Sequence, residues 1–151
     1  MRARSMKVID MAVRHVETID ENVNIRECAK VIRTRHVGSL VVIGKDGKPV
    51  GMITDRDITC EAIAMGRDVD QCLVRDIMSK PVVVARIDDD MVDALARMRE
   101  SGIRRLPVVD ENGVLTGVIT NSNMLEMLSM MLDSMVRNIR SSKTRETAQR
   151  P

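Results

Sequence analysis

The pattern of hydrophobic and polar positions along this chain occurs twice. Residues 33–58 align with residues 99–124 without a gap, at an offset of 66 residues. The identical pairs in this alignment include Leu40/Leu106, Val42/Val108, Gly47/Gly113, Gly51/Gly117, Ile53/Ile119 and Thr54/Thr120. Upstream, residues 17–32 match residues 84–98 if the first copy carries two extra residues. Two copies of one unit indicate a pseudo-symmetric pair rather than a solenoid.

Each copy opens with a strand followed by a helix. The β-branched runs at residues 15–19 and 82–84 predict the strand. Apolar residues at i, i+3, i+4 and i+7 then predict a helix with one buried face. These residues are Ile25, Cys28, Ala29 and Ile32 in the first copy, and Met91, Ala94, Leu95 and Met98 in the second. Asn24 and Asp90 stand at the N-cap positions, with Glu27 and Asp93 three residues on, as in a capping box.

Each copy closes with a hairpin and a second helix. Strands are predicted at residues 40–43 and 50–54, and again at 106–109 and 114–120. Asp46-Gly47 and Asn112-Gly113 separate them, and such pairs favour tight hairpin turns. A helix follows each terminal threonine. The predicted fold is therefore α+β, with two β-α-β-β-α repeats and helices packed on mixed or antiparallel sheets.

The repeat pattern also predicts the domain organisation. We expect the first repeat at residues 1–66, the second at 72–132, and a helix extension with a basic tail at 133–151. The polar stretch at residues 66–71 is interpreted as the linker. Residues 74–78 resemble residues 8–11 and open the second copy.

Composition restricts the possible functions. The 151 residues contain 24 Lys and Arg, 22 Asp and Glu, 13 Met, and no Phe, Tyr or Trp. The lack of aromatic residues argues against modules that stack bases of single-stranded nucleic acid on aromatic platforms. With no Ser-His-Asp or Cys-His arrangement, we expect no enzyme. With two His and no C-x-x-C pair, we expect no metal site, and we interpret Asp88–Asp90 as a helix start.

Cysteine use and hydropathy predict a cytoplasmic protein. The three cysteines, Cys28, Cys60 and Cys72, are an odd number and are interpreted as small buried apolar residues rather than as zinc ligands. The amino-terminal residues include basic side chains but no apolar segment, so they do not resemble a secretory signal. No apolar run approaches the length of a membrane span.

The two strand-to-helix junctions carry the candidate chemistry. They read GMITDRD at residues 51–57 and GVITNSN at residues 117–123. Helix capping by Thr54 would by itself explain one such junction. The same groups also suit a ribonucleotide, because a helix N-terminus attracts phosphate and Asp57 could accept hydrogen bonds from a cis-diol. Arg56, Arg35 and His36 could offset the charge of the phosphate.

The repeat, the element order and the G-h-h-T-x-x-D signature together resemble the CBS domain, over about residues 8–130. The resemblance implies two repeats packed as a pseudo-two-fold CBS pair, or Bateman module. It also implies clefts between the repeats that bind AMP, ADP or ATP, with S-adenosylmethionine or NAD as further options. Thr54 and Asp57 would contact phosphate and ribose. The other implied contacts are Val16 and Thr18, which would flank adenine, and His36, Val37 and Gly38 before the next strand.

The second copy departs from this signature at one position. Thr120 matches, but Asn123 replaces the aspartate and lacks its negative charge. We therefore expect the second site to be weaker. Its other candidates by resemblance are Val82, Val84, Arg104 and Arg105.

The end of the chain predicts a contact surface. Leu125, Leu128, Leu132, Met135 and Ile139 follow heptad spacing within a helix expected to end near residue 140. Residues 141–151 are polar and basic and are expected to be disordered.

The favoured hypothesis is a homodimeric sensor of an adenine nucleotide that acts on a separate, unknown partner protein, with no membrane contact. A structural or dimerisation module with empty clefts is the alternative. Binding of nucleic acid through the basic tail is a weaker one.

Overall fold

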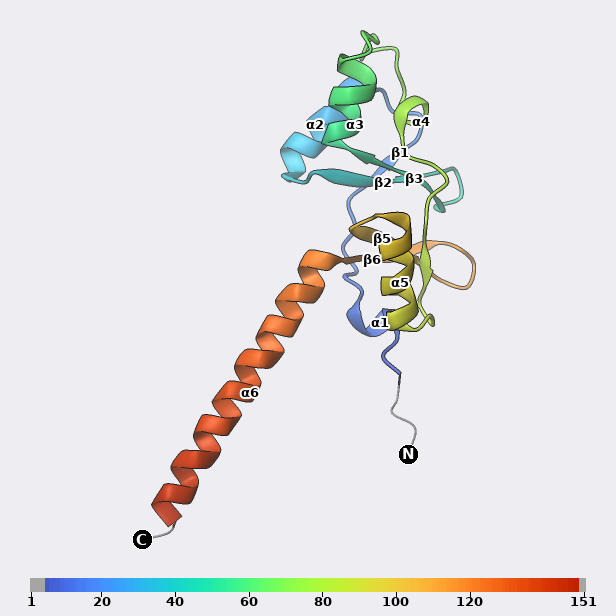
Figure 1. Ribbon diagram of the computed structural model, residues 1–151. Coiled ribbons are helices and arrows are strands. Elements are labelled where there is room, and N and C mark those ends of the chain that lie inside the picture. The colour runs from blue at the N-terminus through green and yellow to red at the C-terminus, as the bar shows by residue number, and fades with distance from the viewer. Residues whose placement is uncertain (1–4, 150–151) are drawn as a thin grey trace. The chain divides into compact units, whose positions relative to one another are not determined.

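The computed structural model describes residues 5–149, and Figure 1 shows the order of the elements. The first copy comprises α1 (Val8–Met11), β1 (Thr18–Asp20), α2 (Ile25–Arg35), β2 (Ser39–Ile43), β3 (Pro49–Thr54), α3 (Asp55–Asp57) and the π-helix η1 (Ile58–Ile63). The second comprises α4 (Val74–Ile77), β4 (Ala85–Arg86), α5 (Met91–Ser101), β5 (Arg105–Val109), β6 (Leu115–Thr120) and α6 (Asn121–Gln149). Both sheets belong to one compact unit that ends at Ile119, and α6 belongs to a second unit.

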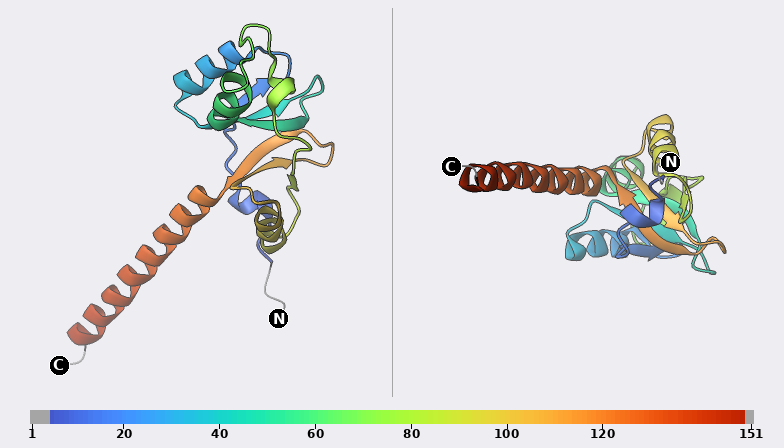
Figure 2. Two further views of the ribbon diagram at one scale, coloured as in Figure 1. Left: turned by 45° about the horizontal axis from the view of Figure 1, so that its top comes forward. Right: turned by 90° about the horizontal axis from the view of Figure 1, so that it is seen from below.

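Each copy forms a three-stranded sheet, with strand order β1-β2-β3 or β4-β5-β6. In the first sheet β1 runs parallel to β2, and β2 runs antiparallel to β3. The helices α2 and η1 lie over the first sheet, and α5 lies over the second (Figure 1). The turns of the two hairpins meet where the Leu115 N–H donates to the Gly47 carbonyl at 3.4 Å (Figure 2). The predicted α+β pair of repeats is confirmed.

The offset of 66 residues holds through the whole repeat. Helix α2 begins at Ile25 and α5 begins at Met91. The Glu21 N–H donates to the Ile43 carbonyl at 3.3 Å, and the Ile87 N–H donates to the Val109 carbonyl at 3.1 Å. The predicted insertion of two residues in the first copy is therefore wrong. Ile19-Asp20 and Ile87-Asp88 match in sequence, but they do not occupy equivalent positions in the two copies.

The first strand of each copy starts later than its β-branched residues predict. Strand β1 is Thr18–Asp20 rather than residues 15–19, and β4 is Ala85–Arg86 rather than residues 82–84. In the first sheet the Val41 N–H donates to the Glu17 carbonyl at 3.1 Å. The residue equivalent to Val41 is Pro107, which has no N–H to donate. The second sheet therefore lacks this hydrogen bond, and β4 begins only at Ala85.

The two copies exchange their opening segments. The Val74 N–H donates to the Val23 carbonyl at 2.8 Å, so α4 joins the first copy. Ser79 and Met52 exchange two backbone hydrogen bonds of 2.8 and 3.2 Å, at the edge of β3. The equivalent bonds place α1 on the second copy: Val13 and Val118 exchange two bonds of 2.9 Å each. Each core is consequently completed by residues that precede the other copy in the sequence.

This exchange explains the two glycines of the junction motif. A Cβ atom on Gly51 would lie 2.6 Å from the Met78 Sδ and 2.9 Å from the Ser79 carbonyl oxygen. On Gly117 it would lie 2.9 Å from the Val13 carbonyl oxygen. Both distances are shorter than van der Waals contact. The glycines therefore allow the exchanged segments to approach the sheets.

Helix starts use the linker as well as the predicted caps. Asn24 Oδ1 accepts the Glu27 N–H at 2.9 Å, as predicted. The Glu27 carboxylate bonds to Lys30 at 2.7 Å rather than completing a capping box. The N–H groups of Ile25 and Arg26 donate to the carbonyls of Cys72, directly after the linker, and of Val69 within it, at 2.9 and 3.1 Å. The start of α2 thus has its free N–H groups satisfied by the chain itself.

Helix α6 is longer than predicted. It continues to Gln149, so the expected end near residue 140 and the expected disorder of residues 141–149 are wrong; residues 150–151 lie outside the described residues. Ser142, Thr144 and Thr147 donate their hydroxyls to carbonyls four residues earlier, at 2.9–3.0 Å. Interspersed Lys, Arg, Glu and Ala residues favour the helix. Within residues 5–149 no helix combines the length and apolar character needed to cross a membrane.

Candidate functional site

Three chain segments meet at one end of the first sheet. Because β2 and β3 are antiparallel, the start of β2 pairs with the end of β3, and Ser39 lies opposite Thr54. Because β1 is parallel to β2, it starts at the same end, with Thr18 opposite Val41. This arrangement brings together three of the predicted groups: the first-strand residues, the loop before β2, and the Thr54 junction.

The Thr54 junction forms a complete capping box. The Asp57 N–H donates to Thr54 Oγ1 at 3.0 Å, and the Thr54 N–H donates to Asp57 Oδ2 at 2.9 Å. Asp57 is half-buried. Within residues 5–149 its second oxygen, Oδ1, accepts no hydrogen bond. The junction therefore holds a carboxylate in a fixed orientation with one oxygen left for another donor.

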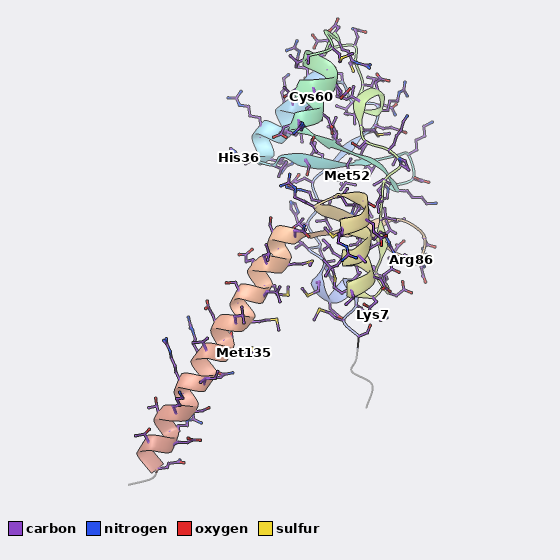
Figure 3. The ribbon with its side chains drawn as sticks, viewed as in Figure 1. Lys7, His36, Met52, Cys60, Arg86 and Met135 are labelled. Carbon is purple, nitrogen blue, oxygen red and sulfur yellow. The ribbon has the colours of Figure 1, made fainter. Side chains whose placement is uncertain are left out.

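The loop before β2 is attached to this junction. The Asp55 N–H donates to the Gly38 carbonyl at 3.1 Å, and Asp55 Oδ1 accepts the Arg56 N–H at 2.8 Å. His36 ends α2 in the left-handed conformation, with φ of 54°, and its side chain is exposed (Figure 3). Val37 is half-buried, and Arg56 is exposed. Sequence reasoning missed Asp55, which follows Thr54 directly and adds a second carboxylate to the junction.

The segment before β1 is held by a charged residue that sequence reasoning also missed. The Glu17 carboxylate accepts from His15 Nε2 at 2.7 Å and lies 3.7 Å from Arg35 Nε. Its neighbours Val16 and Thr18 are half-buried. Arg35 was expected to be available to a phosphate, but this ion pair turns it toward Glu17.

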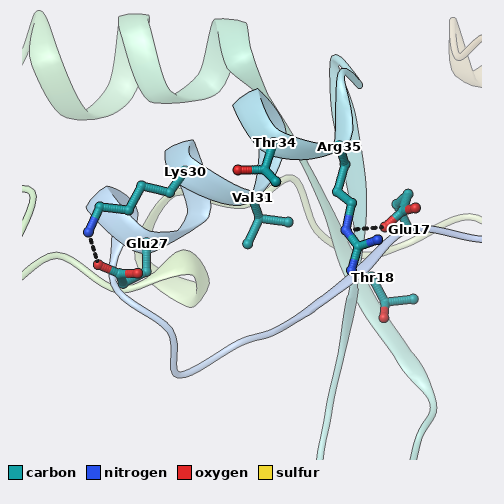
Figure 4. A pocket seen from close by; sticks show the side chains of 7 residues that line it. All are labelled: Glu17, Thr18, Glu27, Lys30, Val31, Thr34 and Arg35. Carbon is teal, nitrogen blue, oxygen red and sulfur yellow. Dashed lines mark hydrogen bonds and ion pairs between the residues drawn. The ribbon is translucent and has the colours of Figure 1, made fainter.

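A pocket of about 360 Å³ opens beside these residues, between α2 and the start of β1 (Figure 4). Two ion pairs, Lys30–Glu27 and Arg35–Glu17, lie along its wall. Its lining is Glu17, Thr18, Glu27, Lys30, Val31, Thr34 and Arg35. Of the predicted site residues it includes Thr18 and Arg35, and it includes neither Thr54 nor Asp57. The pocket is therefore distinct from the Thr54–Asp57 junction.

The second junction retains only half of the capping box. The Asn123 N–H donates to Thr120 Oγ1 at 3.0 Å, and residues 5–149 provide no hydrogen bond from the Thr120 N–H to the Asn123 side chain. Thr120 and Asn123 belong to the unit that contains α6. The remaining second-site candidates belong to the first unit: Val82 and Val84 are half-buried, and Arg104 and Arg105 are exposed.

The acidic run at residues 88–90 acts structurally. Asp90 accepts the Val92 N–H at 2.8 Å and caps α5. Asp89 accepts the Arg86 N–H at 3.0 Å and lies 3.2 Å from Arg97 Nη1, and these contacts lower the pKa of its carboxyl. Among the described residues no three His, Cys, Asp or Glu side chains cluster as metal ligands would.

The cysteines differ in accessibility, which predicts their reactivity. Cys28 and Cys72 are buried as predicted, but Cys60 is exposed on η1, so the expected burial of Cys60 is wrong (Figure 3). Burial raises the pKa of the Cys28 thiol to about 11, so it stays protonated and unreactive at neutral pH. We expect one thiol to react rapidly with Ellman's reagent in the native protein and all three to react after denaturation. Cys60→Ser should abolish the fast reaction, and a fast reaction that persists would contradict this assignment.

The chain matches the CBS domain family over residues 8–62 and 74–130. An uncharacterized protein of Methanopyrus kandleri is 36% identical over 124 residues, which cover 82% of this chain and 63% of that protein. The CBS domain-containing protein YhcV of Bacillus subtilis is 37% identical over 112 residues, covering 74% of this chain and 78% of YhcV. A homoserine O-acetyltransferase of Methanococcus vannielii is 28% identical over 127 residues, covering 83% of this chain but only 26% of that enzyme.

Solved structures show the same fold. A CBS domain pair in complex with 5′-methylthioadenosine and S-adenosylmethionine is 25% identical, with a TM-score of 0.72, and the match covers 85% of this chain and 99% of that one. A hexameric CBS-CP12 protein from bloom-forming cyanobacteria is 26% identical, with a TM-score of 0.67, over 80% of this chain and 69% of that one. The family match, the repeats and the paired sheets agree, and the chain belongs to the CBS domain family, with two CBS domains in tandem.

Proposed function

We propose that this CBS pair is a regulatory module that binds an adenosine-containing ligand at the Thr54–Asp57 junction. The observation that carries the proposal is the fixed Asp57 carboxylate, whose Oδ2 is held by the Thr54 N–H at 2.9 Å. Its Oδ1 is suited to accept hydrogen bonds from the two hydroxyls of a ribose. A similar CBS pair solved with methylthioadenosine and S-adenosylmethionine supports this ligand class. AMP, ADP, ATP, S-adenosylmethionine and NAD are the candidates.

The polar and apolar groups around the junction could each contact a different part of a nucleotide. Two carboxylates, Asp55 and Asp57, lie at the junction, and Arg56 and His36 are the nearby exposed groups that could contact a phosphate. Val16, Thr18, Val37 and Gly38 would line the adenine. The Asn123 junction stays a prediction of a weaker second site.

Regulation would follow from different affinities for two states of the module. A ligand shifts such an equilibrium only by the difference between its affinities for the two states. The change of state would then regulate another protein chain or domain. A similar region occurs within a homoserine O-acetyltransferase, which supports this role. We propose a cytoplasmic homodimer, and the hexameric relative supports self-association within the family.

Calorimetric titration with the five candidate ligands tests the proposal, with Asp57→Asn as the variant. An amide keeps an oxygen for the Thr54 N–H but loses the charge that strengthens hydrogen bonds to a diol. We expect affinity to fall at least about tenfold, because each of the two hydrogen bonds from the diol contributes about 1 kcal/mol more to a charged acceptor than to a neutral one. At 100 times its dissociation constant the ligand should stabilise the native protein by about 2.7 kcal/mol, and this gain should shrink in the variant.

Asp76→Asn provides the matched control. Asp76 Oδ2 accepts the Leu73 N–H at 2.8 Å, the same kind of capping contact, at an exposed site away from the junction. Its substitution should leave ligand affinity unchanged. If none of the candidate ligands binds the unmodified protein, the proposed function is contradicted. If Asp57→Asn binds the ligand as tightly as the unmodified protein, the ligand binds at a site other than the Thr54–Asp57 junction.

A further inference from the structure

Helix α6 carries a continuous apolar seam. The seam residues Leu125, Leu128, Leu132, Met135 and Ile139 are spaced by three and four residues, and each is 51–67% exposed. Met135 is labelled along the helix in Figure 3. Met127, Met130, Met131 and Val136 add exposed apolar surface beside the seam. The helix has 29 residues and none of them is buried. Exposed apolar surface of this extent marks an interaction site.

The charges of α6 indicate what covers the seam. Residues 121–134 contain two acidic residues, Glu126 and Asp133, and no basic one. Residues 135–149 contain four basic residues and one acidic residue, a net charge of +3. Two copies of α6 in parallel would place like charges side by side along both halves. In antiparallel order each acidic half would lie beside a basic half, which is electrostatically favourable.

We propose that α6 pairs with α6 of a second copy of this chain in antiparallel order, centred on Leu132. Leu125 and Ile139 lie seven residues before and after Leu132, so each would face the other across the pair. Leu128 and Met135 would form the intermediate layers. With this register Asn138 of the second copy lies opposite Glu126, and Arg140 of the second copy lies about 3 Å farther along the axis, on the same side of the seam. The methionines beside the seam are flexible enough to fill an irregular interface.

The inference rests on the homodimer in the proposed function and is independent of its ligand. It assigns an interface formed by α6 rather than by the two CBS domains. Light scattering after size exclusion, across a micromolar concentration series of the full chain, measures the dimer. Ligand titration of the same samples reports separately on the Thr54–Asp57 junction.

Leu132→Lys tests the seam, with Thr144→Lys as the control that adds the same charge away from the seam. We expect Leu132→Lys to weaken the dimer roughly 100-fold, because it replaces the central apolar layer in both copies. The control should stay dimeric. A Leu132→Lys protein that remains dimeric would overturn this interface and leave a homodimer through another surface. A monomeric unmodified protein would overturn both the interface and the homodimer.

Charge exchange tests the orientation. Glu126→Lys and Arg140→Glu should each weaken the dimer roughly fivefold, and the double variant should recover the original affinity. In a parallel pair the two positions would be about 21 Å apart along the helix and could not compensate each other. A double variant no tighter than the single variants would overturn the antiparallel order. Far-UV circular dichroism identifies any variant whose α6 fails to fold.

Discussion

Gly51→Ala is expected to lower the free energy of unfolding by about 2 kcal/mol, which corresponds to a drop of about 4–8 °C in Tm for a chain of this size. The added Cβ would meet Met78 Sδ at 2.6 Å and the Ser79 carbonyl oxygen at 2.9 Å. Relief requires the exchanged segment to move away from β3, which strains the two hydrogen bonds between Ser79 and Met52. Alanine also restricts the unfolded chain, and this opposing gain of about 0.4–1 kcal/mol is smaller. Thermal or urea unfolding measures the effect.

Gly38→Ala is the matched control. A Cβ on Gly38 would meet only Asp55 Oδ2, at an ordinary contact distance of 3.7 Å. Its stability should therefore change by less than about 0.5 kcal/mol. An equal loss of stability in both variants would show that the loss at Gly51 does not come from the exchanged segment.

Val74→Ala is expected to cost about 2 kcal/mol of unfolding free energy, and to loosen the first copy rather than the second. Val74 is 0% exposed and belongs to the core cluster that contains Ile25, Leu40 and Ile53. By its position in the sequence, however, it opens the second copy. Hydrogen exchange should accelerate more at the amides of β2 than at those of β5.

Val92→Ala serves as the reference for this measurement. Val92 is 72% exposed on α5, so its truncation should change stability by less than about 0.5 kcal/mol. Faster exchange confined to β5 in Val74→Ala would contradict the exchange of opening segments. The equivalent variant, Val8→Ala, should act on the second copy, because Val8 donates its N–H to the Asp89 carbonyl at 3.0 Å.

Much of the fold could be predicted because its signals are local. Heptad-like spacing around Cys28 predicts the buried face of α2, and the Asp46-Gly47 pair predicts the turn, where Gly47 has a φ of 75°. The capping relation between Thr54 and Asp57 is also local, since three residues separate the two side chains. The predictions were wrong where contacts with a neighbouring strand determine where an element begins. Strand β4 starts late because Pro107, in another strand, cannot donate a hydrogen bond.

The candidate site shows the same division. Thr54 and Asp57 were found from their spacing, and the structure gives their mutual hydrogen bonds. Glu17 was missed, since nothing in its own segment indicates that Arg35 and Val41 both contact it. The π-helical turn after Asp57 was also missed. It depends on bonds between residues five apart, such as the Ala64 N–H to the Thr59 carbonyl at 2.9 Å.

By itself, the sequence determined that this protein is a tandem repeat, and it located the caps, the turns and the apolar seam of α6. These features depend on spacings within one element, which periodicity records directly. Only the tertiary structure decided that each opening segment packs on the other copy, and that Gly51 and Gly117 make room for it. Such contacts join residues far apart in the chain, and their energies depend on which surfaces meet, which no local pattern encodes.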